Sequence, residues 1–366
     1  MEPWTFTAAD LDALELGARM VGSGGAGDTY TMSLLTRQVL ERRGGVTIFP
    51  PDKIRPQDAV IPVGLAGSAL AFGEKPGSSE VYTQAFEAIA AKVSAPQILV
   101  CAYEMAGINA FAPILVAAAL GIPVADLDGM GRALPGLHQT TFNASNVSMA
   151  PCALVDTSGR RVEISESNAE ESEQILRLLM GVFGGWAAFA GYAMDGSQAK
   201  QAGIHNTLRR TVELGRQFQR SRKQTPTVSE AIVHFCQQTP GSRHIGSGHV
   251  VDVRWESASR GAKGVQSKGT ILIRFQGTAD RYLRVEAQNE FLLLIDEGRL
   301  VAQVPQIICL LNSHTGIPLL SERIVPGYVV DVVIFAAPPK WDDPAARTLV
   351  DVANYGYTLP TPGGPR

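Results

Sequence analysis

Short apolar runs alternate with segments of helical spacing in the first part of the chain. The runs that read as strands are Val46–Phe49, Asp58–Val63, Ile98–Cys101 and Ile122–Ala125. The segments in which apolar residues recur with helical spacing are Ala8–Met20, Thr29–Arg43, Glu80–Val93 and Ala110–Leu120. This alternation predicts an α/β N-terminal domain over residues 1–165, a Rossmann-like layered sheet of the doubly wound kind.

The pattern changes twice after that domain. Three segments have helical spacing, namely Ser167–Met180, Ile204–Phe218 and Thr227–Gln237. From Gly241 onward, short runs of period two are separated by turns; these runs are His249–Trp255, Gly269–Phe275, Tyr282–Glu286, Phe291–Ile295, Ile307–Leu311 and Tyr328–Phe335. We therefore predict a second domain over residues 166–366, with a helical segment at 166–240 and a β-rich part at 241–366.

The amino-acid composition and net charge limit the classes of molecule that we expect this chain to bind. A chain of 366 residues with 45% hydrophobic and 18% charged residues has ample material for two buried cores. The net charge of −3 gives no reason to expect nucleic acid or a membrane as partner. The start Met-Glu-Pro-Trp has no basic, apolar leader, and the four cysteines form no Cys-x-x-Cys pair. We expect a cytoplasmic protein with a small-molecule substrate.

Charged side chains gather directly after two of the predicted strands. Glu104 follows the run Ile98–Cys101, and Asp126, Asp128 and Arg132 follow Ile122–Ala125. Parallel strands joined by a helix end at the same edge of a sheet, where open α/β sheets bind ligands. We therefore expect Glu104 and Asp126 to emerge side by side, with Asp128 and Arg132 close by, as a catalytic group.

Structural roles explain the same residues differently. Asp126 and Asp128 could cap the turn after their strand, because Asp-Gly is a common turn pair. Glu104 and Arg132 could form an ion pair that only braces the strand ends. Both alternatives stay open on the sequence.

A glycine loop precedes the second predicted helix. Gly22, Gly24 and Gly27 match the spacing of a dinucleotide-binding loop, but the segment before them has helical rather than strand character. Backbone N–H groups of such a loop, at Gly24, Gly25 and Gly27, could instead approach a substrate. A plain tight turn is the third reading. We expect no nucleotide cofactor.

The histidines and cysteines give weaker evidence of a catalytic or metal-binding role than the charged residues after the strands. His138 lies close in sequence to the acids and could act as an acid or a ligand. A divalent cation held by Glu104, Asp126 and His138 is compatible with the spacing, although nothing demands it, so the metal is left unknown. His244 and His249 have no carboxylate at ligand spacing, and Cys101 has no base placed to activate it.

Several motifs together match more than a general pattern. These are Gly22–Tyr30, Glu104–Asn109, the string Asp126–Pro135, Gln288–Glu290 and Val304–Ile308. On these residues the chain resembles a bacterial and archaeal family of S-methyl-thiohydantoin desulfurases, described as hydantoinase-like. The resemblance implies an α/β unit, a β-rich unit, and chemistry on a five-membered cyclic ureide or thioureide.

Hydrolysis of an S-methyl-thiohydantoin requires an activated water, a proton donor and a grip on the ring. A pair of carboxylates can divide the first two tasks when their pKa values differ. Amide and backbone groups suit the alternating donors and acceptors of the ring; the candidates are Asn109, His138, Gln139 and Asn289 with the glycines Gly24, Gly25, Gly27 and Gly67.

We therefore predict an enzyme that converts an S-methyl-thiohydantoin to a hydantoin and methanethiol, acting as a homo-oligomer. Two other hypotheses remain: a non-catalytic ligand-binding or partner subunit of a hydantoinase-type complex, and a nucleotide-dependent enzyme that uses the glycine loop.

Overall fold

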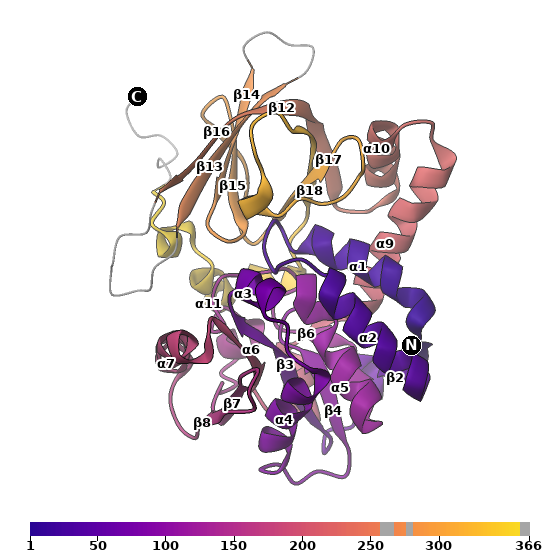
Figure 1. The fold of residues 1–366 in the computed structure, drawn as a ribbon, viewed down its shortest axis with the longest axis vertical. Coiled ribbons are helices and arrows are strands. Elements are labelled where there is room, and N and C mark those ends of the chain that lie inside the picture. Colours follow the sequence, from indigo (N-terminus) through magenta and orange to yellow (C-terminus); the bar gives the residue numbers. More distant parts are fainter. Residues whose placement is uncertain (257–266, 276–280, 359–366) are drawn as a thin grey trace.

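Two sheets make up the core of the molecule. The computed structural model describes residues 1–256, 267–275 and 281–358. In Figure 1 the first sheet lies in the lower part and the second in the upper part, and α9 runs beside the junction. The chain therefore has two sheet-centred units, as the change of hydrophobic period predicted.

The first sheet is mixed, and its described strands have the order β1-β2-β5-β4-β3-β9-β7-β8, with β10 beside β3. Strands β2, β5, β4 and β3 run parallel, and the other pairings are antiparallel. The bounds are β1 Trp4–Phe6, β2 Val46–Phe49, β3 Ala59–Gly67, β4 Ile98–Ala102, β5 Val124–Ala125, β7 Cys152–Val155, β8 Arg161–Ile164, β9 Trp186–Ala190 and β10 Met194–Asp195. The four parallel strands are those predicted.

The crossover helices of the parallel part lie on one face. Residues of α4 (Ser79–Ala90) and α5 (Ala112–Leu120) share a hydrophobic cluster with Ile61, Val63 and Val100. α2 (Tyr30–Arg43) packs beside α5. Right-handed crossovers that step in the same direction put their helices on the same side of the sheet. The crossovers among β3, β4 and β5 therefore stay on one face, and the doubly wound, Rossmann-like arrangement stays a prediction.

The other face is covered by short elements from later in the chain. Val60, Leu99 and Cys101 share a second cluster with α6 (Thr141–Ala144), α7 (Ala169–Phe183), α8 (Gly196–Ala202) and α11 (Pro344–Leu349). The smaller α3 (Ala69–Glu74) follows β3 directly. Six 3₁₀ turns of the described residues complete these layers: η1 Ala8–Asp10, η2 Pro51–Lys53, η3 Gly107–Ala110, η4 Ser321–Arg323, η5 Pro339–Asp342 and η6 Val352–Tyr355.

The predicted helical segment 166–240 also contains a central strand. β9 inserts between β3 and β7, and each of its residues is buried. The string Trp-Ala-Ala-Phe-Ala has no alternation of polar and apolar residues, because both faces of the strand are covered. Residues on both sides of position 165 therefore share the first sheet.

The second sheet is antiparallel and curls into a half-barrel. Its order is β16-β15-β14-β13-β12-β18-β17, and β15 also contacts the distant β17. The bounds are β12 Ser242–Glu256, β13 Lys268–Phe275, β14 Tyr282–Ala287, β15 Phe291–Asp296, β16 Arg299–Gln303, β17 Ile307–Asn312 and β18 Val329–Phe335. β12 carries bulges near Ile245 and Val251, which bend it between β18 and β13.

Close helix packing joins the two units. α1 (Leu11–Val21) crosses α9 (Thr207–Gln224) where a Cβ on Gly17 would lie 1.9 Å from the Thr211 carbonyl oxygen. A Cβ on Gly215 would meet the Ala13 carbonyl oxygen at the same distance. α10 (Val228–Gln238) continues the contact, and Phe218, Phe235 and Phe335 pack together across it. The two glycines fix this crossing, because a side chain at either would collide with backbone.

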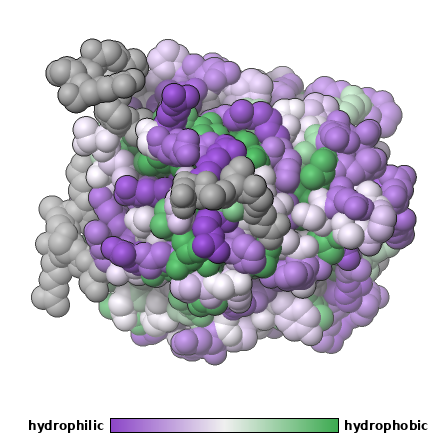
Figure 2. Space-filling model, turned by 90° about the horizontal axis from the view of Figure 1, so that it is seen from above, coloured by the Kyte–Doolittle hydropathy of each residue, from purple (hydrophilic) through white to green (hydrophobic). Residues whose placement is uncertain are grey.

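Among the residues that the structure describes, no helix is both long and apolar enough to cross a bilayer. Figure 2 looks down on the half-barrel end, where small hydrophobic areas are separated by hydrophilic side chains.

Candidate active site

The carboxyl end of β4 delivers Glu104 to the junction between the two sheets. Asn109, from η3, holds it: Nδ2 of Asn109 donates to Glu104 Oε1 and to the Tyr103 hydroxyl at 2.8 Å, while Oδ1 accepts from the Leu65 N–H. A Cβ on Gly64 would lie 2.2 Å from the Tyr103 ring, so strand β3 needs glycine at this position. Asn109 therefore fixes the direction of the Glu104 carboxylate.

Glu104 is poised to hold a proton. It is only 4% exposed, and its second oxygen has a long contact, 3.4 Å, with the Leu134 N–H. Burial raises the pKa of Glu104 well above its usual range, and the negative charges of Glu290 and Asp128 raise it further against the Asn109 hydrogen bond. The surroundings of Glu104 thus favour its protonated form.

Glu290 comes from the half-barrel and lies within electrostatic reach of Glu104. It lies in the turn between β14 and β15, and it is 2% exposed. Its Oε1 accepts a hydrogen bond of 2.7 Å from Asn289, whereas Oε2 has no hydrogen-bond partner among the described residues. Burial raises the pKa of Glu290 to about 7, against the lowering effect of the Asn289 hydrogen bond and of Arg132. Glu104 and Glu290 are therefore two buried carboxyls that interact electrostatically at this junction.

Sequence reasoning missed Glu290 as an acid of the site. The Gln288–Glu290 motif drew attention to Asn289, and no strand-edge argument could place a residue of the second unit beside the first. The signal that could have identified Glu290 was its carboxylate, which lies in that motif directly after Asn289.

Arg132 supplies a fixed positive charge beside the pair. It is fully buried, and its guanidinium donates to the backbone carbonyls of Ala133, Gln306 and Phe291 at 2.8, 2.5 and 3.1 Å. Burial lowers the pKa of Arg132 to about 10, against the charges of Glu290, Tyr355 and Glu104, so it stays protonated near neutral pH. No hydrogen bond is recorded between Arg132 and Glu104.

The glycine loop closes against the same junction. A Cβ on Gly25 would lie 2.3 Å from Glu290 Oε1, and one on Gly24 (φ +82°) would lie 2.5 Å from the Phe291 ring. A Cβ on Gly27 would meet Ala69 instead. The loop follows helix α1, as expected, and lacks the preceding strand of a dinucleotide fingerprint. Gly24 and Gly25 therefore line the side of the junction that carries Glu290.

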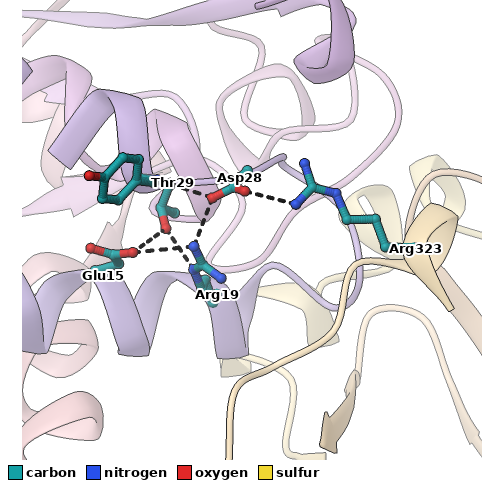
Figure 3. A network of polar contacts seen from close by, with 6 residues as sticks. Glu15, Arg19, Asp28, Thr29 and Arg323 are labelled. Atoms are coloured by element: carbon teal, nitrogen blue, oxygen red, sulfur yellow. Dashed lines mark hydrogen bonds and ion pairs between the residues drawn. The ribbon is translucent and has the colours of Figure 1, made fainter. Parts of the chain in front are cut away.

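A polar network holds the end of this loop, as Figure 3 shows. Asp28 accepts from Arg19 of α1 at 2.8 Å and from Arg323 of η4 at 2.9 Å. Thr29 links Arg19 to Glu15, donating to Glu15 at 3.0 Å. The loop is thus tied to both the first unit and the half-barrel.

Asp126 and Asp128 have separate positions. Asp126 is fully buried, and its Oδ1 accepts from the Leu208 and Arg209 N–H groups at the start of α9. Burial raises the pKa of Asp126 to about 6. The hydrogen bonds of its carboxylate run to the start of α9, so Asp126 serves that helix, and its pairing with Glu104 stays a prediction. The carboxylate of Asp128 serves a different segment. Its Oδ2 accepts hydrogen bonds from the backbone N–H groups of Met105 and Gly131, which stabilises the loop that follows Glu104.

Burial raises the pKa of Asp128 to about 7, and its charge acts on Glu104. The hydrogen bonds of Asp128 thus fit the structural alternative, in which it stabilises the turn after its strand. The hydrogen bonds of Asp126 fit a role as a cap of α9.

Gln139 and Tyr355 form an outer layer. Gln139 Nε2 donates to the Tyr355 hydroxyl at 3.0 Å and to the Leu349 carbonyl, and its Oε1 accepts from the Gly136 N–H. Tyr355 lies within electrostatic reach of Arg132 and Glu290. His138 packs at Gly136, and burial lowers its pKa. Gly67 packs at Gly185 instead of the acid pair.

The other candidates lie apart from the pair. His244 bonds to buried Asp331 at 2.7 Å, in a cluster with Ser229 and Ser247. Burial raises the pKa of Cys101 well above its usual range, which disfavours a nucleophilic thiolate. Within the described ranges, no group of three or more His, Cys, Asp or Glu is arranged to hold a metal ion.

Comparison with known sequences and structures shows which proteins this chain resembles. Sequence models described as the S-Me-THD-like N-terminal domain and the S-Me-THD-like C-terminal domain match residues 9–166 and 166–362. A crystal structure of a protein from Chromobacterium violaceum is similar in fold, with 22% identity, a TM-score of 0.75, and coverage of 97% of this chain and 98% of that one. No curated protein matches the chain.

Proposed function

Because the chain belongs to the S-Me-THD-like family, we propose that it hydrolyses the carbon–sulfur bond of an S-methyl-thiohydantoin at the Glu104–Glu290 pair. The observation that carries this proposal is two buried, electrostatically coupled carboxyls with raised pKa values at the junction of the two units. One oxygen of Glu290 has no hydrogen-bond partner among the described residues and is free to accept one from a substrate water.

The pKa values divide the roles. Glu290, with a pKa of about 7, is partly ionised near neutral pH and is the base. Burial and the Glu290 charge raise the pKa of Glu104 and favour its protonated form, so we assign Glu104 as the acid. Two carboxyls in environments that separate their pKa values are the arrangement that acid–base catalysis requires.

The first step adds water across the ring C=N bond. Water attacks the carbon between the two ring nitrogens while Glu290 takes a proton from it. Glu104 gives its proton to the ring nitrogen, so the C=N double bond becomes a C–N single bond. The tetrahedral intermediate then carries a hydroxyl and the methylthio group on one carbon.

The second step breaks the carbon–sulfur bond. Glu290 returns its proton to the sulfur, and methanethiol leaves. Glu104 takes the proton of the hydroxyl as the carbonyl forms. The products are a hydantoin and methanethiol, and both carboxyls regain their starting protonation.

The neighbouring groups support both steps. Arg132 places positive charge near the pair without bonding to either carboxylate, which favours ionisation of Glu290 and stabilises negative charge during attack. Asn109 keeps the Glu104 carboxyl pointed into the junction. Since both acids are buried, the junction at Gly24 and Gly25 must admit the ring.

Thiol release from S-methyl-thiohydantoins tests the proposal. We expect Glu104→Gln and Glu290→Gln each to lower kcat by about 10²-fold or more, the size of one acid–base contribution. The matched control is Glu286→Gln, since Glu286 is an equally buried carboxylate on β14 that bonds to Thr270 and Arg284.

Two results would reject this function. Absence of thiol release by the native protein, with the ring still bound, would support a ligand-binding subunit instead. Full activity in both glutamine variants would remove the acid pair from the chemistry.

A further inference from the structure

Helix α7 lies at the outer edge of the first unit (Figure 1). A row of exposed apolar side chains follows one side of this helix. Leu178 is 80% exposed, Val182 62% and Ile175 40%. These residues are spaced three and four apart, so they lie on one helical face. Large apolar side chains clustered on one face of a helix mark an interaction surface.

A gap lies within this row. Gly181 sits on the same face, and a Cβ built there would meet nothing within 4 Å. A bulky side chain from a facing helix can enter that space, which is how ridges and grooves of two helices interlock. This face of α7 therefore has both protruding apolar side chains and a space at Gly181 that a side chain of a facing helix can fill.

Charge along α7 is divided between its two ends. Glu170 and Glu171 lie in the first turn. At the other end, Arg160 donates to the Val182 carbonyl at 3.0 Å, and the Lys75 ammonium lies 3.8 Å from the position of a Cβ on Gly184. Glu74 is the acid next to Lys75 in sequence. Acidic side chains thus lie where α7 begins, and the Lys75 ammonium lies beside its end, whereas the charge of Arg160 is already paired with Asp156.

We propose that this face binds the same face of a second copy of the chain, with the two α7 helices antiparallel about a two-fold axis near Leu178. In that arrangement Ile175 of one copy enters the space at Gly181 of the other. Glu171 of one copy then lies opposite Lys75 of the other. A two-fold contact repeats each favourable pair, since the same patch serves both copies.

The oligomeric state in solution tests the pairing. Sedimentation equilibrium of the full chain is expected to give a dimer, and Leu178→Glu should raise the dimer dissociation constant at least about tenfold, as for loss of a central apolar anchor. The matched control is Leu300→Glu on β16, where Leu300 is 44% exposed but far from α7 in the sequence and fold; it should leave the dimer intact. A native monomer, or a Leu178→Glu dimer of native affinity, would overturn the proposal.

A charge exchange tests the orientation. Lys75→Glu and Glu171→Lys are each expected to weaken the dimer, because each puts like charges opposite one another. The double variant Lys75→Glu with Glu171→Lys should recover dimer affinity. Two single effects that merely add in the double variant would exclude the antiparallel arrangement.

Cross-linking locates the axis independently of affinity. All four native cysteines are buried. Leu178→Cys is therefore expected to form an intermolecular disulfide under mild oxidation, and Leu300→Cys is not. Equal cross-linking of the two variants would contradict an axis near Leu178.

Discussion

The carboxyl of Glu290 links the chemistry of the site to the stability of the fold. Its pKa of about 7 in the folded chain compares with an ordinary value of 4.5, because burial disfavours the charged form. The folded state therefore binds its proton more tightly between these pH values. Stability from this group is complete below about pH 4.5 and is lost as the pH rises to about 7.

We expect the free energy of unfolding to fall by on the order of 3 kcal/mol from Glu290 over this pH window. Glu290→Gln should flatten that decline, since it removes the titrating group. Guanidinium unfolding at a series of pH values measures both. An unchanged slope in the variant would mean that Glu290 is not the group that titrates.

The activity should depend on pH through the same residue. The proposed base must be ionised, so kcat/KM is expected to rise as the pH passes through about 7. It should fall again where Glu104 loses its proton at higher pH. A thiol-release profile over the pH range checks this, and a flat profile around pH 7 would argue against Glu290 as the base.

At the scale of elements, Asp126 serves α9. Its carboxylate accepts from Leu208 at 2.8 Å, and Asn206, at the helix start, makes no capping bond of its own side chain. We expect Asp126→Ala to lower the unfolding free energy by about 1–2 kcal/mol, the value of a lost N-cap. Asp12→Ala on α1 is the control, because Asp12 is 76% exposed and only pairs with Arg37. Equal denaturation midpoints for the two variants would refute a capping role.

The glycine loop offers a matched pair of positions. Gly24 and Gly44 have similar φ angles, +82° and +85°, but a Cβ on Gly24 would meet the Phe291 ring and one on Gly44 would meet nothing within 4 Å. Gly44→Ala should therefore cost about 1 kcal/mol of backbone strain alone. Gly24→Ala should cost about 1–3 kcal/mol more, because the ring must shift, and thiol release should fall with it. Identical losses of stability would mean that the loop does not pack on Phe291.

At the scale of the whole molecule, Arg132 ties the two units together. Its guanidinium belongs to the first unit, and two of its carbonyl acceptors, on Phe291 and Gln306, belong to the half-barrel. Arg132→Met would leave these buried carbonyls without their donor, so we expect a loss of about 2–4 kcal/mol. Arg254→Met is the control, since the Arg254 side chain is 79% exposed. A native-like denaturation midpoint for Arg132→Met would show that the junction does not depend on this residue.

Much of the architecture follows from local pattern. The parallel strands β2, β3, β4 and β5 and the antiparallel β-rich second part follow from hydrophobic period and glycine or proline punctuation, which depend on neighbouring residues only. The sequence pattern did not predict β9, because burial on both faces of the strand removes the alternation of polar and apolar residues. Whether a short apolar run becomes a helix or a strand is then decided by where the sheet has room.

Among the site residues, Glu104 and Asn109 could be placed together from sequence, since both follow one strand. Asp126 could not be assigned to α9, because the helix it caps begins about eighty residues later. The strand order predicted a shared edge but not the direction in which each carboxylate points. Only packing settles that direction.

The amino-acid sequence by itself determined the alternating α/β pattern, the antiparallel second part, the glycine loop after a helix, and the family to which the chain belongs. Each is carried by residues close in sequence or by motifs. The tertiary structure decided which acids interact. Glu290 comes within electrostatic reach of Glu104 because the half-barrel docks on the carboxyl edge of the first sheet, held by Arg132 and the Asp28–Arg323 pair. Such an interaction depends on the summed packing of both units, which no local pattern encodes.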